Sequence, residues 1–202
     1  MRGRAPFWPR LAASADSRAE EARERHDKAE AFRHAMMPHM DAAYNLARYL
    51  TRDPSAAEDI VQDAFLRAYR SFDTWRGEAA KPWLLTIVRN CFLNSVGGAV
   101  DRMSGRPVHE IVGDLPDALI ESSNPESLLA DQNEAAMLRA TIEQIPEPFR
   151  ETLILRELEE LSYKEIAAIA QVPIGTIMSR LARARQMLAD LLLPYASRKA
   201  RS

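Results

Sequence analysis

Residues 160–188 read ELSYKEIAAIAQVPIGTIMSRLARARQML, and this stretch decides the fold that we expect for the whole chain. Ser162 followed three positions later by Glu165 is a capping box, which predicts a helix that begins just after the serine. Pro173 cannot continue that helix, because proline lacks the backbone N–H and restricts the residue before it. A second helix is then expected from about Ile174, so the stretch predicts two short helices joined by a tight turn.

The predicted second helix has an apolar face and a basic face. Its apolar residues recur at spacings of four, three and four, namely Ile177, Leu181, Ala184 and Leu188. A helix–turn–helix with a basic second helix fits the major groove of DNA. The candidate DNA contacts on it are Gly175, Thr176, Met178, Ser179, Arg180, Ala182 and Arg183. An ordinary helical hairpin with solvated arginines is the alternative interpretation.

Some of these residues suit particular parts of DNA. Arg183 can form two hydrogen bonds with a guanine edge, and Ser179 can bond to a base or a phosphate. The backbone N–H groups around Gly175 and Thr176 open the helix, where a phosphate is favoured. The helix therefore offers groups for both the bases and the backbone of a duplex.

The stretch resembles region 4.2 of bacterial RNA polymerase sigma factors of the extracytoplasmic-function (ECF) type, in the sigma-70 family. The resemblance is carried by residues 161–167, LSYKEIA, and by residues 172–185, VPIGTIMSRLARAR. It implies that the −35 promoter element is read as duplex through Met178, Ser179, Ala182 and Arg183. Family members often carry Arg or Lys where this chain has Met178, a departure that bears on promoter preference and leaves the expected fold unchanged.

Composition favours an all-α protein. The chain has 202 residues, of which 47% are hydrophobic, and Ala, Leu, Arg and Glu dominate. Its net charge of −2 argues against a non-specific coat on nucleic acid. The charge is unevenly distributed, since residues 107–134 contain seven acidic and no Lys or Arg residues, whereas residues 174–202 contain six Lys or Arg and one Asp.

Several kinds of site are not indicated by the sequence. Cys91 is the only cysteine and lies in an apolar segment, so we expect a buried thiol and no intrachain disulfide. The four histidines show no ligand spacing with it, and there is no nucleophile–base pair or Gly-rich phosphate loop. We therefore expect no metal, no cofactor and no enzymatic activity. No apolar run approaches about 18 residues, so we expect a cytoplasmic protein without membrane insertion.

The first half of the chain predicts a leader and two helices. Residues 1–30 have little apolar periodicity, which indicates a disordered or loosely helical leader of unknown role. An amphipathic helix is expected over about residues 31–50. Asp53 followed by Pro54 then starts a helix that runs to about residue 72.

The outer face of this latter helix is acidic, and it has three interpretations. Asp59 and Asp63 lie four residues apart and could ligate a metal, although no matching acidic or histidine helix is found. A solvated helix face is the plain alternative. Residues 57–65, AEDIVQDAF, resemble sigma region 2.2. That resemblance implies that Glu58, Asp59, Gln62 and Asp63 dock on the coiled coil of the polymerase β′ clamp.

Residues 71–82, SFDTWRGEAAKP, are expected to form a loop because of their Gly, Pro and Asp content. Phe72, Trp75, Arg76 and Lys81 place aromatics beside cations, which gives a single-stranded base a stacking surface and a phosphate partner. The alternative is that Phe72 and Trp75 close the small core. The loop resembles sigma region 2.3, which implies melting of the −10 promoter element and capture of a flipped base.

Residues 83–95 predict a strongly apolar helix on which Arg89 and Asn90 are polar. Asn90 matches an asparagine of sigma region 2.4, and the resemblance implies a base-edge contact at the −10 element. The candidate −10 contacts are therefore Phe72, Trp75, Arg76, Lys81, Arg89 and Asn90.

The rest of the chain predicts a flexible acidic linker and a second helical domain. In the resembling family the linker threads the positively charged channel of the polymerase, so Asp114, Asp117 and Glu121 are candidates for imitating nucleic acid; a soluble tether is the alternative. Residues 145–158 resemble region 4.1 and are expected to form a turn and a helix with Leu158 among its inward residues. The expected parts follow in chain order: a leader (residues 1–30), a first domain (31–98), a linker (99–124), a second domain (125–194) and a basic tail (195–202).

The resemblance implies a sigma factor that binds core RNA polymerase at its β′ clamp and β flap and directs it to promoter DNA. Family members are commonly held inactive by an anti-sigma factor, so such a factor is an expected partner. Two other functions remain open from the residues. One is a stand-alone dimeric helix–turn–helix regulator, and the other is an interaction protein with no DNA role.

Overall fold

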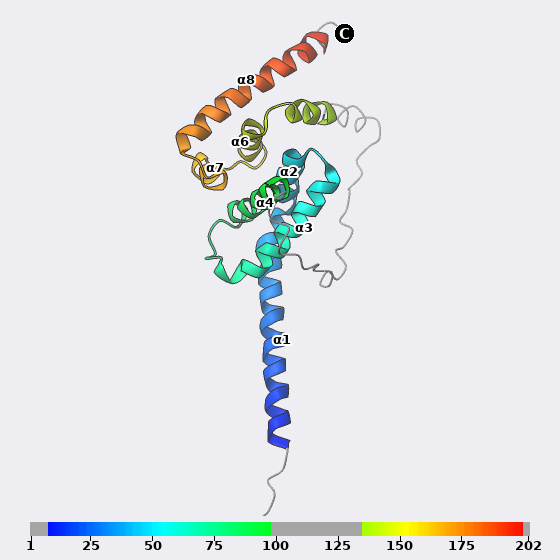
Figure 1. Ribbon diagram of the computed structural model, residues 1–202, viewed down its shortest axis with the longest axis vertical. Coiled ribbons are helices and arrows are strands. Elements are labelled where there is room, and N and C mark those ends of the chain that lie inside the picture. Colours follow the sequence, from blue (N-terminus) through cyan, green and yellow to red (C-terminus); the bar gives the residue numbers. More distant parts are fainter. Residues whose placement is uncertain (1–7, 98–134, 200–202) are drawn as a thin grey trace, which may run out of the picture.

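The computed structural model describes residues 8–97 and 135–199, and every regular element within these ranges is helical (Figure 1). The all-α expectation is therefore confirmed. In chain order the elements are α1 (Trp8–Met36), η1 (Met37–His39), α2 (Met40–Thr51), α3 (Pro54–Ser71), η2 (Phe72–Thr74), α4 (Ala80–Gly97), the helical residues 135–143, α6 (Glu147–Glu157), α7 (Tyr163–Ala170) and α8 (Ile174–Lys199). The expected linker over residues 99–124, with Asp114, Asp117 and Glu121, lies outside the described residues.

The helices α2, α3 and α4 pack against one another to form the N-terminal bundle. The helix α3 begins as the sequence predicts, because Asp53 caps it by accepting a 2.9 Å hydrogen bond from the backbone of Ser55, and Pro54 follows at the first helical position. Leu85 is fully buried in this bundle, although the periodicity did not single it out. Small buried side chains let α2 and α3 approach each other closely. They are Ala43, Ala47, Ala64 and Ala68.

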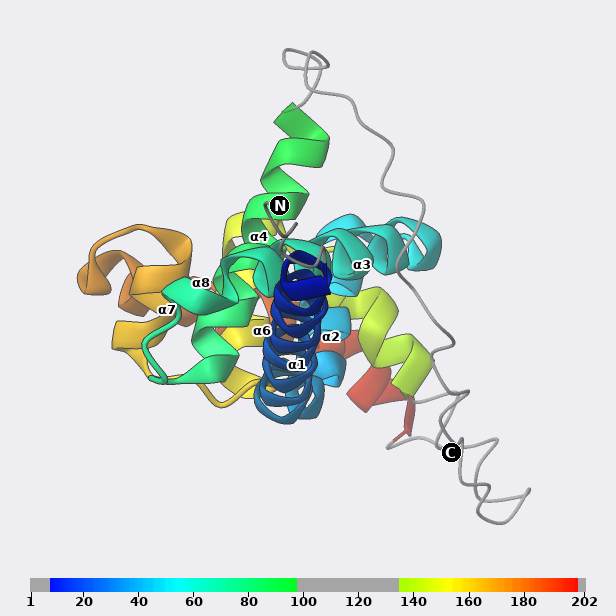
Figure 2. The ribbon, with the colours of Figure 1, turned by 90° about the horizontal axis from the view of Figure 1, so that it is seen from below.

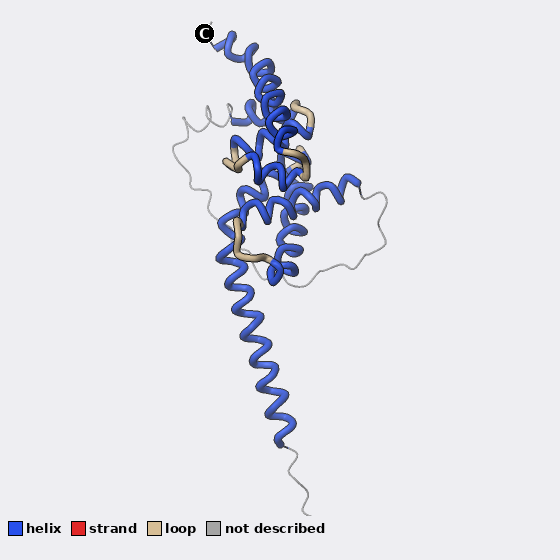
Figure 3. Tube along the Cα trace, turned by 90° about the vertical axis from the view of Figure 1, so that its left-hand side faces the viewer, coloured by secondary structure: helices blue, strands red, loops and turns tan. Residues whose placement is uncertain are grey.

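The single helix expected over residues 31–50 is wrong, because the chain changes direction at η1. Pro38 lies in the first positions of η1 and has no backbone N–H, so the α-helical bonding pattern is interrupted between α1 and α2. The helix α1 begins at Trp8, within the segment expected to be a disordered or loosely helical leader, so that segment is helical from Trp8 onward. It projects from the bundle as one long helix (Figure 3), and its described side chains among residues 17–27 are exposed.

Residues 135–143 and the helices α6, α7 and α8 form the C-terminal bundle. The predicted capping box is confirmed: the Ser162 hydroxyl accepts a bond from the Glu165 backbone at 3.3 Å, and the Glu165 carboxylate accepts one from the Ser162 backbone at 2.8 Å. Leu158 does not point inward as expected and is 48% exposed, because α6 ends one residue before it. The helix α8 continues through Pro194, where the second domain was expected to end.

The two bundles pack directly against each other, with α2 against α6 and α4 against α7. We call this contact the closed interface. Arg150 crosses it with only 2% of its surface exposed, donating from Nε to the Tyr49 carbonyl at 2.7 Å and from Nη1 to the Ile145 carbonyl at 2.6 Å. Seen from below, the C-terminal bundle lies behind the N-terminal one (Figure 2). One apolar cluster draws buried residues from both bundles, including Leu46, Leu84, Leu155, Ile166 and Ile169.

Candidate nucleic-acid and partner-binding surfaces

The basic face of α8 is exposed, as the periodicity predicts. Ile177, Leu181 and Ala184 are at most 2% exposed and fix the helix on its bundle, while Met178 on the opposite side is 52% exposed. Ser179 donates its hydroxyl hydrogen to the Thr176 carbonyl at 2.9 Å, which leaves its oxygen available as an acceptor. Exposed side chains on this face are Met178, Ser179, Ala182, Arg183 and Gln186.

Two details at α8 differ from the expectation for a DNA-facing helix. The backbone N–H of Thr176 donates to the Pro173 carbonyl at 2.9 Å and so is not available to a phosphate. The neighbouring Gly175 is open, since a Cβ placed there meets nothing within 4 Å.

Arg185 holds Glu157 through two hydrogen bonds of 3.0 and 2.7 Å, and this raises the pKa of the Arg185 guanidinium. Of the three arginines from 180 to 185, Arg183 is therefore best placed to contact DNA; this role stays a prediction.

The aromatic loop of the N-terminal bundle forms a cleft. The Phe72 and Trp75 rings stack with centroids 5.5 Å apart, and the Trp75 and Trp83 rings lie 6.2 Å apart at a tilt of 37°. Trp75 is fixed by a 2.6 Å hydrogen bond from its Nε1 to the Glu78 carbonyl. The cleft has a volume of about 320 Å³, and we call it the base cleft. Its lining residues are Thr74, Trp75, Arg76, Glu78, Ala79 and Trp83.

The loop packs on the core and also lines a cleft, so the core alternative is supported and the contact with a single-stranded base stays a prediction. Phe72 and Trp75 are half-buried and pack on the main apolar cluster, as the core alternative requires. Trp75 nevertheless lines the base cleft, and Arg76 beside it is exposed. Trp83 lines the base cleft next to Trp75, a role that the sequence analysis did not assign to it. Its position directly after Pro82, at the first turn of α4, was the signal that it lies at a surface rather than deep in the bundle.

Lys81 and Arg89, two of the candidate −10 contacts, are only partly exposed and are paired with carboxylates in this arrangement. Lys81 Nζ lies 2.7 Å from Glu159 Oε2 and donates to the Glu159 carbonyl at 2.9 Å. Arg89 Nε lies 2.5 Å from Glu151 Oε1, and the Glu151 side chain is 2% exposed. Both carboxylates belong to the C-terminal bundle. In the closed arrangement both cations are therefore paired within the chain, and their contact with the −10 element stays a prediction; Asn90 on the same helix is exposed.

Burial dominates the electrostatics of the closed interface. Desolvation raises the pKa of Glu151, and the nearby Arg89 guanidinium opposes that rise without cancelling it. Breaking such a pair from one side leaves a buried charge without a partner, which is strongly unfavourable. Removing either partner of the Arg89–Glu151 pair should therefore destabilise the closed interface.

The acidic face of α3 is exposed and lies apart from these pairs. Glu58, Asp59 and Gln62 are exposed, while Asp63 is half-buried and lies 2.9 Å from Arg67. Across the described residues, no three His, Cys, Asp or Glu side chains gather as a metal site would require. Cys91 is buried beneath this helix, and burial raises the pKa of its thiol to about 11, which agrees with the expected inert thiol.

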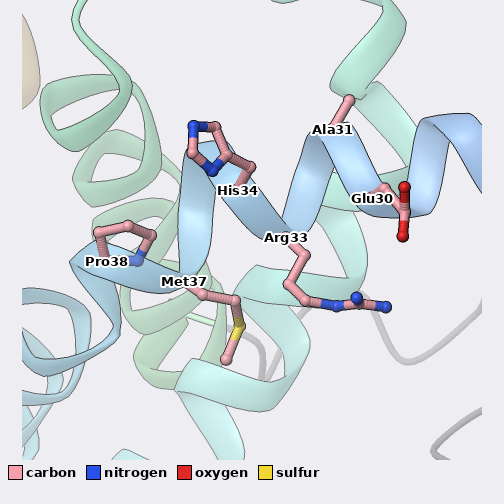
Figure 4. A pocket seen from close by; sticks show the side chains of 6 residues that line it. All are labelled: Glu30, Ala31, Arg33, His34, Met37 and Pro38. Atoms are coloured by element: carbon pink, nitrogen blue, oxygen red, sulfur yellow. The ribbon is translucent and has the colours of Figure 1, made fainter.

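A further hollow of about 690 Å³ lies at the end of α1 and at η1 (Figure 4). It is lined by Glu30, Ala31, Arg33, His34, Met37 and Pro38. The Arg33 and His34 side chains point in different directions within it (Figure 4). The hollow therefore does not present a converging set of polar groups to a ligand.

Known families match both bundles. Residues 35–99 match Sigma-70 region 2, and residues 135–188 match Sigma-70, region 4. The chain is 36% identical over 165 residues to ECF RNA polymerase sigma factor SigE of Mycolicibacterium smegmatis, an alignment that covers 81% of this chain and 62% of that relative. It is 39% identical over 144 residues to ECF RNA polymerase sigma-E factor of Escherichia coli K12, covering 69% of this chain and 75% of the relative.

Two solved structures are also similar to this chain. The sigma factor RpoE, in complex with the anti-sigma factor NepR from Bartonella quintana, is 30% identical with a TM-score of 0.58, covering 81% of this chain and 97% of that chain. CnrH, in complex with the cytosolic domain of CnrY, is similar in fold, with 22% identity, a TM-score of 0.57 and coverage of 81% and 88%. No helix among the described residues is long and apolar enough to cross a membrane.

Proposed function

This chain belongs to the ECF sigma factors of the sigma-70 family, and we propose that it binds core RNA polymerase and directs it to promoters for transcription initiation. In this proposal the C-terminal bundle reads the −35 element as duplex, and the N-terminal bundle opens the −10 element. The protein acts by binding and positioning rather than by catalysis. It works in the cytoplasm, where core polymerase and the chromosome are found.

One observation carries the proposal: the chain has two separate surfaces that suit two different forms of DNA. The exposed face of α8, with Arg183, suits the major groove of a duplex. The base cleft, walled by Trp75 and Trp83, suits an unstacked single-stranded base. A stand-alone regulator needs only the first surface, so the second favours a subunit that takes part in promoter opening.

We assign the exposed acidic face of α3 to the polymerase β′ clamp. Glu58, Asp59 and Gln62 are exposed there and lie on a helix whose other side is fixed in the bundle. Mixed polar surfaces of this kind steer association and select partners. The C-terminal bundle contacts the β flap in the same proposal, which holds both bundles along one promoter.

The closed arrangement has to open before the −10 element can be bound as proposed. Lys81 and Arg89 are held by carboxylates of the C-terminal bundle, so promoter phosphates have to displace Glu159 and Glu151. Polymerase binding at two places supplies the free energy for this change, because the second attachment becomes intramolecular once the first is made. Each DNA surface can then be weak by itself.

An anti-sigma factor is the expected regulator of this chain. The relative with 30% identity was solved with the anti-sigma factor NepR. A protein that holds the two bundles together would keep Lys81 and Arg89 covered and so keep the chain inactive. This partner is proposed from the relative and from the closed interface together.

A gel-shift experiment with and without core polymerase tests the proposal. Promoter duplex containing both elements should bind poorly to the free chain at physiological salt and tightly once core polymerase is added. A Glu58→Lys, Asp59→Lys variant should lose the polymerase-dependent binding, and Glu24→Lys on the exposed part of α1 should keep it. Tight sequence-specific binding by the free chain, unaffected by polymerase, would contradict the proposal and favour a stand-alone regulator.

A further inference from the structure

Most of α1 precedes residue 35, where the match to sigma region 2 begins, yet α1 contacts the segment that builds the base cleft. Lys28 and Phe32 lie four residues apart on α1 and therefore on the same face of the helix. Both side chains are partly buried, unlike their described neighbours among residues 17–27. Their partners lie at the end of α3 and in η2.

Phe32 is the centre of an aromatic cluster. Its ring meets Phe65, Tyr69 and Phe72 edge-on, at centroid distances of 6.2, 5.2 and 5.3 Å. Edge-to-face pairs at these distances stabilise beyond the area they bury. Phe72 in turn stacks on Trp75, so the Phe72 ring alone lies between Phe32 and the tryptophan that lines the base cleft.

Lys28 fixes the next residue along. Its Nζ lies 2.5 Å from Asp73 Oδ2 and 5.3 Å from the centroid of the Tyr69 ring. The ammonium group thus has an anion and an aromatic face as partners, and the Lys28 side chain is 26% exposed. Asp73 is the middle residue of η2.

The residues that contact α1 directly precede, in the chain, residues that line the base cleft. Phe72 and Asp73 are held from α1, and the next two residues, Thr74 and Trp75, line the base cleft. Gly77 beyond them has φ +78° and no neighbour within 4 Å of a Cβ placed on it, and on that side Trp75 is held by its hydrogen bond to the Glu78 carbonyl. The contacts from α1 hold the other side of the cleft, through Phe72 and Asp73.

We propose that Lys28 and Phe32 of α1 are positioning residues of the promoter-opening site, which hold η2 and Trp75 in the geometry that receives an unstacked −10 base. This inference rests on the proposed function and extends the site to a helix that begins outside the matched family region. Neither residue contacts the base. Both act by limiting the conformations of η2.

A charge-swap cycle tests the Lys28 part. The variants are Lys28→Glu, Asp73→Lys and the two combined, assayed with saturating core polymerase by permanganate reactivity of promoter thymines. Each single variant should lower opening about three- to tenfold, because a partly exposed pair is replaced by like charges. The double variant should recover to within about twofold. Affinity for core polymerase and for −35 duplex should not change in any of them.

Arg23→Glu is the matched control, since it makes the same charge reversal on an exposed position of α1, and it should leave opening unchanged. Phe32→Leu keeps an apolar side chain but removes the ring edges, and it should lower promoter opening more than Lys28→Glu does. Phe32→Tyr keeps the ring edges and should open promoters about as well as the parent chain. Circular dichroism identifies a variant that fails to fold, in which case the charge-swap cycle decides alone.

Two results would overturn the inference while leaving the proposed function intact. One is a parent chain that opens promoters with core polymerase while Lys28→Glu and Asp73→Lys open them equally well. The other is a double variant no better than the worse single variant. A parent chain that opens no promoter with core polymerase would instead contradict the proposed function, and this inference would fall with it.

Discussion

Arg183 and Arg185 lie two positions apart on α8 but have different surroundings. Arg185 is held by Glu157, whereas Arg183 is exposed on the face that carries Met178 and Ser179. A guanidinium with this freedom can align both of its donors with a guanine edge. The difference between the two residues makes Arg183 the first position to change.

Arg183→Ala should weaken binding of the polymerase complex to the −35 element by about 1–3 kcal/mol and relax the preference at one base pair. Competition binding against −35 duplexes with single base changes measures both effects. Arg139→Ala removes the same charge from an exposed position on another helix and is the control. An equal loss from both variants would indicate that the arginine acts only through its charge.

Glu165 is the residue through which pH should act on the helix–turn–helix. Hydrogen bonds from the side chain and backbone of Ser162 lower the pKa of this carboxyl below its usual 4.5. The folded state therefore favours the ionised form. The resulting stabilisation is present above about pH 4.5 and is lost as pH falls through the lowered pKa.

Glu165→Ala should therefore lower the free energy of unfolding by about 1 kcal/mol at pH 7, and by less at pH 3.5. Ser162→Ala removes the two hydrogen bonds of the hydroxyl and keeps the one that the Ser162 backbone donates, so it should show a weaker pH dependence in the same direction. Denaturant unfolding of both variants and the parent chain at the two pH values measures this. A loss that is equal at both pH values would show that the capping box is not the cause.

At the scale of elements, the loop between η2 and α4 should govern promoter opening. Trp75→Ala removes the stacking wall of the base cleft and should weaken capture of a −10 base by about 1–3 kcal/mol. Trp75→Phe keeps an aromatic face and should recover most of the loss. Permanganate reactivity at fixed promoter occupancy separates opening from binding. An equal loss of promoter opening and of promoter binding would indicate that Trp75 acts through the folding of the bundle.

Elements whose ends are set by local chemistry were predictable. Asp53 and Ser162 cap α3 and α7 through neighbours within three residues, so the sequence around them contains the whole cause. The break at Pro38 was also local, but the apolar stripe on either side of it concealed the change of direction. Whether residues 8–30 are disordered or helical was left open, because an exposed helix has no apolar periodicity to reveal it.

Contacts between distant elements were not predictable. Arg89 and Glu151 are 62 residues apart, and Lys81 and Glu159 are 78 apart, so no local pattern pairs them. A sequence reading can indicate that Lys81 and Arg89 are cations on a DNA-binding surface, but not that a second bundle covers them. The contact of Lys28 with Asp73 was missed for the same reason.

At the scale of the whole molecule, the closed interface should compete with promoter DNA. Glu151→Gln and Glu159→Gln together keep the side-chain shapes but leave Arg89 and Lys81 without their anionic partners. The free double variant should then bind single-stranded −10 DNA at least about tenfold more tightly than the parent chain, because buried pairs broken from one side are strongly unfavourable.

Fluorescence anisotropy with a labelled −10 oligonucleotide measures this affinity. Glu157→Gln, which removes the exposed partner of Arg185 within the C-terminal bundle, is the control and should change little. Unchanged affinity in the double variant would mean that Lys81 and Arg89 are not the groups that DNA meets.

Run-off transcription with purified core RNA polymerase, on fragments of the genome that encodes this chain, tests the central claim most directly. The account predicts discrete transcripts that require this chain and share −35 and −10 elements upstream of their starts, and it predicts that Arg183→Ala and Trp75→Ala together abolish them. Failure of the folded chain to bind core polymerase, or to yield any transcript beyond those of core polymerase alone, would contradict it.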